Sequence, residues 1–507
     1  MSTVSLGSPA GKWIMASAIL ASSMAFIDST ALNVVLPSLQ KSLNAKGPDL
    51  FWVLNAYLLM LASLILIGGS LGDRLGRKKV FMIGIVIFIL GSAACGLTPG
   101  VGLLITFRVL QGVGGALMIP GSLSLISSLI DKEERGRAIG TWSAVTTLVT
   151  IGGPILGGAL GDAGLWRAIF FINIPIGIIA LIILSFRVGE SRDEEGSSSV
   201  DIPGAVTLGL GLACLTFGFL RAPSLGFGHI QAWGSLAAGV LLLAGFLVVE
   251  YKSKQPMMPL RLFANRTFTG VNLLTFFLYA GLGAAMLFLS LDLVQAQGYS
   301  QLQSGLSFLP FTILMISIAR YAGSLADKYG PRLLLIIGPL VAGAGFLILS
   351  LVQQTKGPSE FWTTFFPGIF TLGLGMSITV APLTATVMGS VEDRFSGTAS
   401  GVNNAMTRIA GVFANAILGA LAVLLFYGAL QKQIPPGTTN RSAVMAEAVN
   451  LGNAQVPAGV KGADRVFVQN AYRASFIYAY TRVMRVAAGL CFLGVLLSIF
   501  VFEFRKS

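Results

Sequence analysis

Long apolar runs constrain this chain more than any other feature of its sequence. Of its 507 residues, 54% are hydrophobic and only 11% are charged, whereas about 25% of the residues in a soluble globular domain are charged. A helix needs about 20 apolar residues to cross the ~30 Å of hydrocarbon in a bilayer, and the runs here have that length. Strands of an outer-membrane barrel would instead be segments of about 10 residues with alternating polarity. We therefore expect an all-α polytopic membrane protein.

Charged or Pro/Gly-rich breaks between the apolar runs predict fourteen membrane-spanning helices. They lie at about 13–37, 50–72, 80–98, 101–124, 138–160, 168–186, 202–221, 232–250, 268–294, 304–325, 333–351, 363–388, 401–426 and 486–503. The polar segment 427–485 begins with two prolines and a glycine, and we expect it to form a partly helical outer loop.

The distribution of basic residues predicts the orientation in the membrane. Placing the N-terminus in the cytoplasm puts nineteen Lys and Arg residues on the inner side and five in short outer loops, as the positive-inside rule requires. We therefore expect a multi-pass protein of the bacterial cytoplasmic (inner) membrane with both termini in the cytoplasm. The inner loops also account for the net charge of +13, which in a soluble chain would indicate a nucleic-acid partner.

The chain has few residues that carry enzyme chemistry. Cys95, Cys214 and Cys491 each lie in an apolar run with no ligand-spaced partner, and His229 is the single histidine. These residues predict no metal site, no disulfide and no Ser/His/Asp triad. No phosphate-binding GxxxxGK[ST] loop occurs, so we expect neither an enzyme nor an ATP-driven pump.

An internal repeat divides the chain into two halves. Residues 69–78 read GSLGDRLGRK and residues 323–332 read GSLADKYGPR, and these segments follow the second and tenth expected spans. A parallel repeat at a distance of eight spans requires an even number of inserted spans between two six-helix halves. We therefore expect an N-terminal six-helix bundle in 1–190, two inserted helices with their linkers in 191–265, and a C-terminal six-helix bundle in 266–507.

Four segments resemble motifs of the major facilitator superfamily, in its fourteen-span drug:proton antiporter branch. Residues 69–78 are similar to the signature cytoplasmic loop of the superfamily, and residues 153–158, GPILGG, resemble the core of its antiporter motif. Residues 28–37, DSTALNVVLP, and 166–175, WRAIFFINIP, look like segments of the drug-exporting branch. Val149 stands where the antiporter motif has its first glycine. The resemblance covers essentially the whole chain and implies the major facilitator fold.

Two charges within the expected spans are the candidates for proton coupling. Asp28 lies in the middle of the first span, where an ionised carboxylate is costly unless it faces water or a partner. A carboxylate that binds and releases a proton suits a proton-coupled cycle, although an Asp that only orders the spans remains the alternative. Arg108 resembles the fourth-span arginine that the family associates with proton transfer. The alternative for Arg108 is snorkelling to the membrane interface.

Two further motifs have roles that the resemblance implies. The family's cytoplasmic loop is a gating latch that stabilises the outward-open state, and its counterparts here are Gly69, Asp73, Arg74, Gly76, Arg77 and Lys78. Plain topological anchoring by the basic residues is compatible with that role. The antiporter motif would seal a helix contact against leaks through Gly153, Pro154, Gly157 and Gly158. The alternative is an ordinary small-residue packing interface.

Three polar residues are candidates for contact with cargo. Asn33 belongs to the first-span motif, while Asp292 and Arg320 lie in or near the ninth and tenth spans. Asp292 either attracts a cationic cargo from the cavity or sits in the outer interface. Arg320, if it lines the cavity, favours an anionic or zwitterionic cargo.

These observations predict a proton-coupled secondary active transporter that exports amphipathic small molecules or drugs by alternating access. The same fold could instead export a specific metabolite, lipid precursor or siderophore, and a non-transport membrane subunit is a third interpretation. The expected partners are a small-molecule substrate, protons and membrane lipids, with no nucleic acid, no cofactor and a monomer as the working unit.

Overall fold

The computed structural model describes residues 3–131, 133–191, 201–254, 256–392, 396–438 and 440–501. Within these ranges the long elements are all helices, and strand pairing is limited to an isolated bridge between Val4 and Ile130. The predicted all-α fold class is confirmed.

The N-terminal half consists of seven helices. They are α1 (Pro9–Leu43), α2 (Gly47–Leu75), α3 (Arg77–Leu97), α4 (Val101–Leu129), α5 (Arg135–Asp162), α6 (Ala168–Phe171) and α7 (Asn173–Arg187). Ser8 begins α1 as an N-cap whose side chain accepts a hydrogen bond from the Gly11 backbone N–H, which satisfies a donor that the helix itself leaves free. The short α6 and α7 together occupy the place of the sixth expected span.

The rest of the chain forms the inserted pair of helices and the C-terminal half. The elements are α8 (Ile202–Leu225), α9 (Ile230–Lys252), η1 (Leu260–Ala264), α10 (Arg266–Leu291), the π-helical η2 (Asp292–Ala296), α11 (Gln301–Ser307), α12 (Leu309–Tyr329), α13 (Arg332–Leu349), η3 (Pro358–Glu360), α14 (Phe365–Gly389), α15 (Ser396–Gln433), α16 (Arg441–Ala446), η5 (Glu447–Asn453) and α17 (Ala463–Val501). The tenth expected span is divided between α11 and α12.

Thirteen helices among the described residues are long and apolar enough to cross a membrane, with α6 and α7 counted as one span and α11 counted with the first part of α12. The count of fourteen is therefore not matched. The fifth expected span falls in α5, which is a continuous helix over Arg135–Asp162 but contains residues whose side chains lie outside the described part of the structure.

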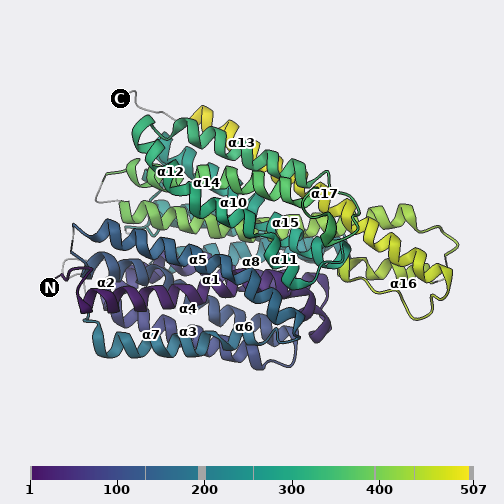
Figure 1. Ribbon diagram of the computed structural model, residues 1–507, viewed down its shortest axis with the longest axis horizontal. Helices are drawn as coiled ribbons and strands as arrows, with labels where there is room; N and C mark the ends of the chain where they lie inside the picture. Colours follow the sequence, from purple (N-terminus) through teal and green to yellow (C-terminus); the bar gives the residue numbers. More distant parts are fainter. Residues whose placement is uncertain are drawn as a thin grey trace.

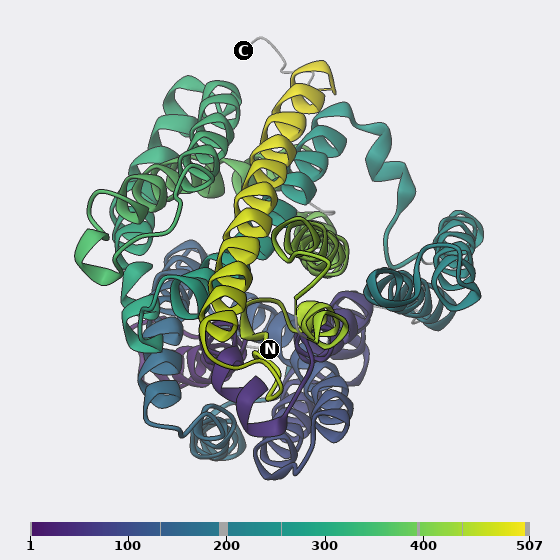
Figure 2. The ribbon, with the colours of Figure 1, turned by 90° about the vertical axis from the view of Figure 1, so that its right-hand side faces the viewer.

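The two halves lie side by side, with the inserted helices at the edge. Figure 1 shows α1–α7 in one group, and α10, α12, α13, α14 and α17 in a second group beside it. Helices α8 and α9 pack chiefly on each other, and α8 also contacts α15 and α2. Figure 2 shows this hairpin at the periphery of the molecule. The division at residues 190 and 265 stays a prediction.

The start of α1 and the end of α17 lie at the same end of the molecule, on the left in Figure 1, and α16 projects from the opposite end. We call these the inner and outer ends, after the predicted orientation. The segment expected as a loop at 427–485 is largely helical, because α15 continues to Gln433 and α17 begins at Ala463. Apolar runs mark only the part of a helix that lies inside the hydrocarbon. The polar first half of α17 contains no proline or glycine that would interrupt it, so the helix begins well before the apolar run.

Candidate functional site

A buried ion pair joins the two residues predicted for proton coupling. Asp28 of α1 and Arg108 of α4 are only 0% and 1% exposed, and the Arg108 guanidinium donates from Nη1 to Asp28 Oδ2. Gln111 lies one turn beyond Arg108 and bridges the pair, since its Nε2 donates to Asp28 Oδ1 over 2.9 Å and its Oε1 accepts from Arg108 Nη1 over 2.8 Å. Both carboxylate oxygens therefore have donors.

Close helix packing positions Arg108. A Cβ on Gly112 would lie 2.7 Å from the Tyr57 carbonyl oxygen, and a Cβ on Gly114 would lie 2.5 Å from the Phe88 backbone nitrogen. Glycine at these positions therefore lets α4 approach α2 and α3 closely. The approach brings the Arg108 side chain 4.4 Å above the Tyr57 ring.

A polar network extends from the ion pair through the N-terminal half. Gln111 Nε2 also donates to Ser92 Oγ of α3 over 3.4 Å, and Asn173 Nδ2 of α7 donates to the same oxygen over 3.0 Å. Ser92 in turn donates to the Phe170 carbonyl over 2.7 Å. Arg108 Nε donates to the carbonyl of residue 53 over 3.1 Å. A buried charge is tolerated in such a site because its hydrogen bonds are satisfied.

Sequence reasoning missed the neutral members of this network. Gln111 follows Arg108 at a spacing of three, which places both side chains on one helix face, and this spacing was the available signal. Asn173 lies in the motif-like segment 166–175, but the motif did not indicate its partner. Ser92 carried no signal, because a lone serine within a span is compatible with a simple bond to its own helix.

The predicted gating loop is a tight junction between two helices. Helix α2 continues to Leu75 and α3 begins at Arg77, so Gly76 alone connects them. Gly76 has a φ of +107°, a conformation that L side chains rarely adopt. The Glu190 carboxylate accepts the backbone N–H groups of Lys78 and Lys79 over 2.9 Å and 3.1 Å, and so caps the start of α3.

Of the other members of the expected loop, the structure describes the surroundings of Gly69 and the backbone of Arg77. Gly69 lies within α2, near the Pro120 side chain of α4. The Arg77 backbone N–H donates to the Ser191 carbonyl over 2.8 Å. The side chains of Asp73 and Arg74 lie outside the described part of the structure. A gating role for these residues stays a prediction.

The antiporter-motif glycines place α5 between two neighbouring helices. A Cβ on Gly157 would lie 2.4 Å from the Ala31 carbonyl oxygen of α1, and one on Gly158 would lie 2.4 Å from the Gln301 carbonyl oxygen of α11. Gly153 likewise faces α1, and Pro154 lies against Gly305 of α11. The motif therefore forms a close contact between the two halves.

A hydrogen-bonded contact between the halves lies next to the motif, at the outer end. The Asp162 carboxylate at the end of α5 accepts the backbone N–H groups of Gln301 and Leu302 over 2.8 Å and 2.9 Å, and the Gln301 side chain donates to Ser38 of α1. Burial raises the pKa of Asp162, but hydrogen bonds from Leu302, the Ser300 hydroxyl and Gln301 outweigh burial and lower it. We call Asp162, Ser300, Gln301 and Leu302 the outer latch.

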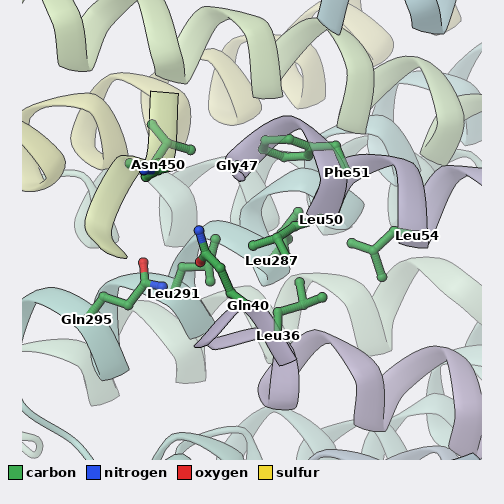
Figure 3. Close-up of a pocket in the computed structure, with 11 residues that line it drawn as sticks. Leu36, Gln40, Gly47, Leu50, Phe51, Leu54, Leu287, Leu291, Gln295 and Asn450 are labelled. Carbon is green, nitrogen blue, oxygen red and sulfur yellow. The ribbon is translucent and has the colours of Figure 1, made fainter. Parts of the chain in front are cut away.

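A small cavity shows how closely the halves meet at this end. Figure 3 shows leucines of α1, α2 and α10 around it, together with Gln40, Gln295 and Asn450. Its volume is about 10 Å³, which is roughly the room that one water molecule needs. Drug-sized ligands occupy sites of about 300–1,000 Å³. This cavity is therefore too small to hold a drug-sized cargo.

The three candidate cargo residues occupy different environments. Asp292 is 0% exposed at the start of η2, and its Oδ2 accepts from Gln297 Nε2 over 3.2 Å, while Oδ1 has no hydrogen-bond partner among the described residues. Its carboxylate does not face open space in this conformation. Asn33 is partly buried on α1, and the Arg320 side chain lies outside the described part of the structure. The cargo role of all three stays a prediction.

Two packed helical halves, many membrane spans and a charge pair held inside one half define a polytopic transporter fold. The chain belongs to the Major Facilitator Superfamily, whose family model matches residues 18–415. The predicted family is therefore confirmed. Similarity to solved structures supports the same fold: a bacterial homologue of the human lysosomal transporter Spinster, solved in an inward-facing and unoccupied conformation, matches with a TM-score of 0.67 at 18% identity, covering 99% of this chain and 100% of that one.

Curated relatives cover most of the chain. It is 33% identical over 400 residues to the tetracenomycin C resistance and export protein of Streptomyces glaucescens, which is 78% of this chain and 73% of the relative. It is also 33% identical over 409 residues to the multidrug transporter protein MdtP of Bacillus subtilis, covering 80% of this chain and 74% of that protein. Major facilitator proteins are transporters, in agreement with the expectation that this chain is not an enzyme.

Proposed function

We propose that this protein exports amphipathic small molecules, such as drugs or antibiotics, from the bacterial cytoplasm in exchange for protons. The names of the relatives support the cargo class, because one is a resistance and export protein and another a multidrug transporter. The presence of many helices that are long and apolar enough to cross a membrane supports a multi-pass protein of the inner membrane. We further propose that protons and lipids are its other partners and that the monomer is the working unit.

The observation that carries the proton-coupled part is the buried triad of Asp28, Arg108 and Gln111. An ionised Asp28 attracts Arg108 strongly in a site that excludes water. A proton on Asp28 removes that attraction and leaves Arg108 with an uncompensated charge, which is costly in the same surroundings. Proton binding therefore changes the relative free energies of packing arrangements of α1 and α4, which is what a coupled conformational cycle needs.

In this proposal, the contacts between the halves open and close during the transport cycle. The antiporter-motif glycines and the outer latch close the outer end, so release of cargo to the outside requires these contacts to separate. The junction at Gly76 lies at the inner end, next to the Glu190 cap. We propose that this junction is the inner latch and the α5 contact the outer seal in an alternating-access cycle.

The test uses the full-length protein in vesicles that hold an imposed pH gradient. Adding cargo should dissipate the gradient, and a panel of structurally unrelated drugs and single metabolites separates a multidrug exporter from a dedicated one. Asp28→Asn should abolish the dissipation, because an amide cannot carry a proton, and Asp28→Glu should retain part of it. Asp464→Asn, at an exposed position in the first turn of α17, is the matched control. Parental rates in Asp28→Asn would disprove the assignment.

A further inference from the structure

A second arginine lies within the membrane-spanning part of the chain, and no carboxylate among the described residues forms an ion pair with it. Arg408 is partly buried on α15, twelve residues after the helix begins at Ser396, or about 18 Å from its inner end. Within the part of the chain that the structure describes, it makes no hydrogen bond or ion pair, and its titratable neighbours are the phenols of Tyr57 and Tyr279. Arg108, by contrast, is neutralised by Asp28.

The face of α15 that carries Arg408 points toward the other half. A Cβ on Gly401 or Gly411 would lie 2.8 Å or 3.7 Å from leucine side chains of α2, and a Cβ on Gly419 would lie 2.9 Å from Phe51. Asn415 Nδ2 donates to Asn55 Oδ1 of α2 over 3.3 Å. When Arg408 is placed among these positions, the spacings along α15 are seven, three, four and four residues, so Arg408 lies on the same stripe that faces α2.

Residues of α2 place Arg408 near the depth of the buried ion pair. The Tyr57 ring lies beneath Arg108, and the next residue, Leu58, lies beside Gly411, one turn after Arg408 in α15. Tyr279, the other neighbour of Arg408, belongs to α10 in the C-terminal half. Arg408 therefore sits between the two halves near the middle of the membrane, where transporters of this kind bind cargo.

We propose that Arg408 binds the anionic group of an amphipathic cargo, so that the preferred substrates carry a carboxylate, sulfonate or acidic phenol beside an apolar ring system. An unpaired guanidinium within the bilayer is costly, and a cargo anion supplies the missing charge. The planar fork of the guanidinium suits a bidentate contact with a carboxylate or sulfonate. The proposal deepens the proposed export function, on which it rests, by naming the chemical class of the cargo.

The experiment compares two probes that differ by one charge. N-Phenyl-1-naphthylamine is neutral, and 8-anilinonaphthalene-1-sulfonate has the same ring system with a sulfonate. Equilibrium dialysis against the detergent-solubilised full-length protein, corrected with protein-free micelles, gives the Kd of each probe. Arg408→Gln should weaken binding of the sulfonate at least tenfold, as loss of a charge-assisted contact predicts, and change the Kd of the neutral probe less than twofold.

Two further variants complete the test. Arg408→Lys, which keeps the charge but not the fork, should give an intermediate Kd for the sulfonate. Arg482→Gln removes an exposed arginine that lies over the Tyr478 ring, and it should leave both Kd values unchanged. Equal losses for both probes in Arg408→Gln, or no change in either, would overturn the proposal. A protein that binds the sulfonate through Arg408 but dissipates no pH gradient with any cargo would instead refute the proposed export function.

Discussion

At the scale of single residues, the buried triad holds a carboxylate, a guanidinium and an amide together through mutual hydrogen bonds. Asp28 and Arg108 were each predictable as site residues, because a charge within an apolar run is costly unless it has a partner or a function. That they pair with each other was not predictable, because the contact joins residues 80 positions apart and depends on how closely the glycines of α4 let the helices approach. Gln111 forms hydrogen bonds with both residues. It is neutral, so its position three residues after Arg108 was its only signal in the sequence.

Gln111 provides a prediction at this scale. In Gln111→Leu the side chain keeps its approximate size, but Asp28 Oδ1 loses the donor that Gln111 supplies, while Ser92 keeps its hydrogen bond from Asn173. Because a buried acceptor without a partner costs about 1–3 kcal/mol, we expect a lower unfolding temperature and slower proton-coupled transport. Thermal unfolding in detergent and the vesicle assay measure both effects. The same change at Gln231, which is exposed in the first turn of α9, should alter neither, and an unaffected Gln111→Leu would show that the bridge is dispensable.

Gly76 provides a second prediction. Its φ of +107° is unfavourable for any residue with a Cβ by about 1–2 kcal/mol, and an added Cβ would lie 2.8 Å from the Glu190 carboxyl carbon. Gly76→Ala should therefore lower the unfolding temperature. Gly140→Ala is the control, because it lies inside α5 with open space around it and alanine favours helix. Equal unfolding temperatures for the two variants would contradict the strain argument.

At the scale of helices, the sequence predicted the spans more reliably than their ends. Apolar runs locate the hydrocarbon-spanning part of a helix, so the early start of α17 at Ala463 and the extension of α15 to Gln433 were not detectable from hydropathy. The contact between α5 and α11 was equally hidden. Glycines on one face of α5 indicated close packing, but which helix they meet depends on how the two halves dock.

The outer latch, which joins the end of α5 to the start of α11 in the other half, provides a prediction at this scale. Asp162→Asn removes the negative charge that binds the two backbone N–H groups at the start of α11. The outer end should then open more often, which raises the labelling rate of a cysteine placed at Ser38. Asp49→Asn, whose carboxylate accepts from the backbone within the start of α2, is a control because its bond does not cross between the halves. Equal labelling rates in the two variants would show that the latch does not hold the halves together.

The pH dependence of this latch follows from the lowered pKa of Asp162. A carboxylate with a lowered pKa contributes to the closed arrangement at pH values above the usual range of a carboxyl group, and the contribution is lost as the pH falls through the lowered pKa. The labelling rate at residue 38 should therefore stay constant from about pH 5 to 8 and rise only in stronger acid. A rise near neutral pH would mean that another group controls the outer end.

At the scale of the whole molecule, the internal repeat predicted more than any single motif. Two segments that match at an offset of 254 residues lie at the α2–α3 and α12–α13 connections, and the halves around them lie side by side in Figure 1. What the repeat could not predict is the way in which the halves differ. Pro331 follows Gly330 in the second connection, whereas Arg77 follows Gly76 in the first. Only the first connection therefore has a backbone N–H at that position to bind the chain after α7.

The orientation of the whole molecule is the last prediction, and it rests on the inserted hairpin. Because α8 and α9 are two spans, they return the chain to the side it left, and both halves then have the same orientation. Cysteines at the exposed positions Arg137, Lys254 and Lys328 should be protected from an impermeant reagent added to whole cells, whereas cysteines at Gly226 and Gln455 should react. A variant without Cys95, Cys214 and Cys491 sets the background. All five positions should react once the cells are opened, which shows that protection reflects the membrane and not burial. Labelling of residue 328 in intact cells would mean that the two halves have opposite orientations, and the parallel arrangement of the repeat would be wrong.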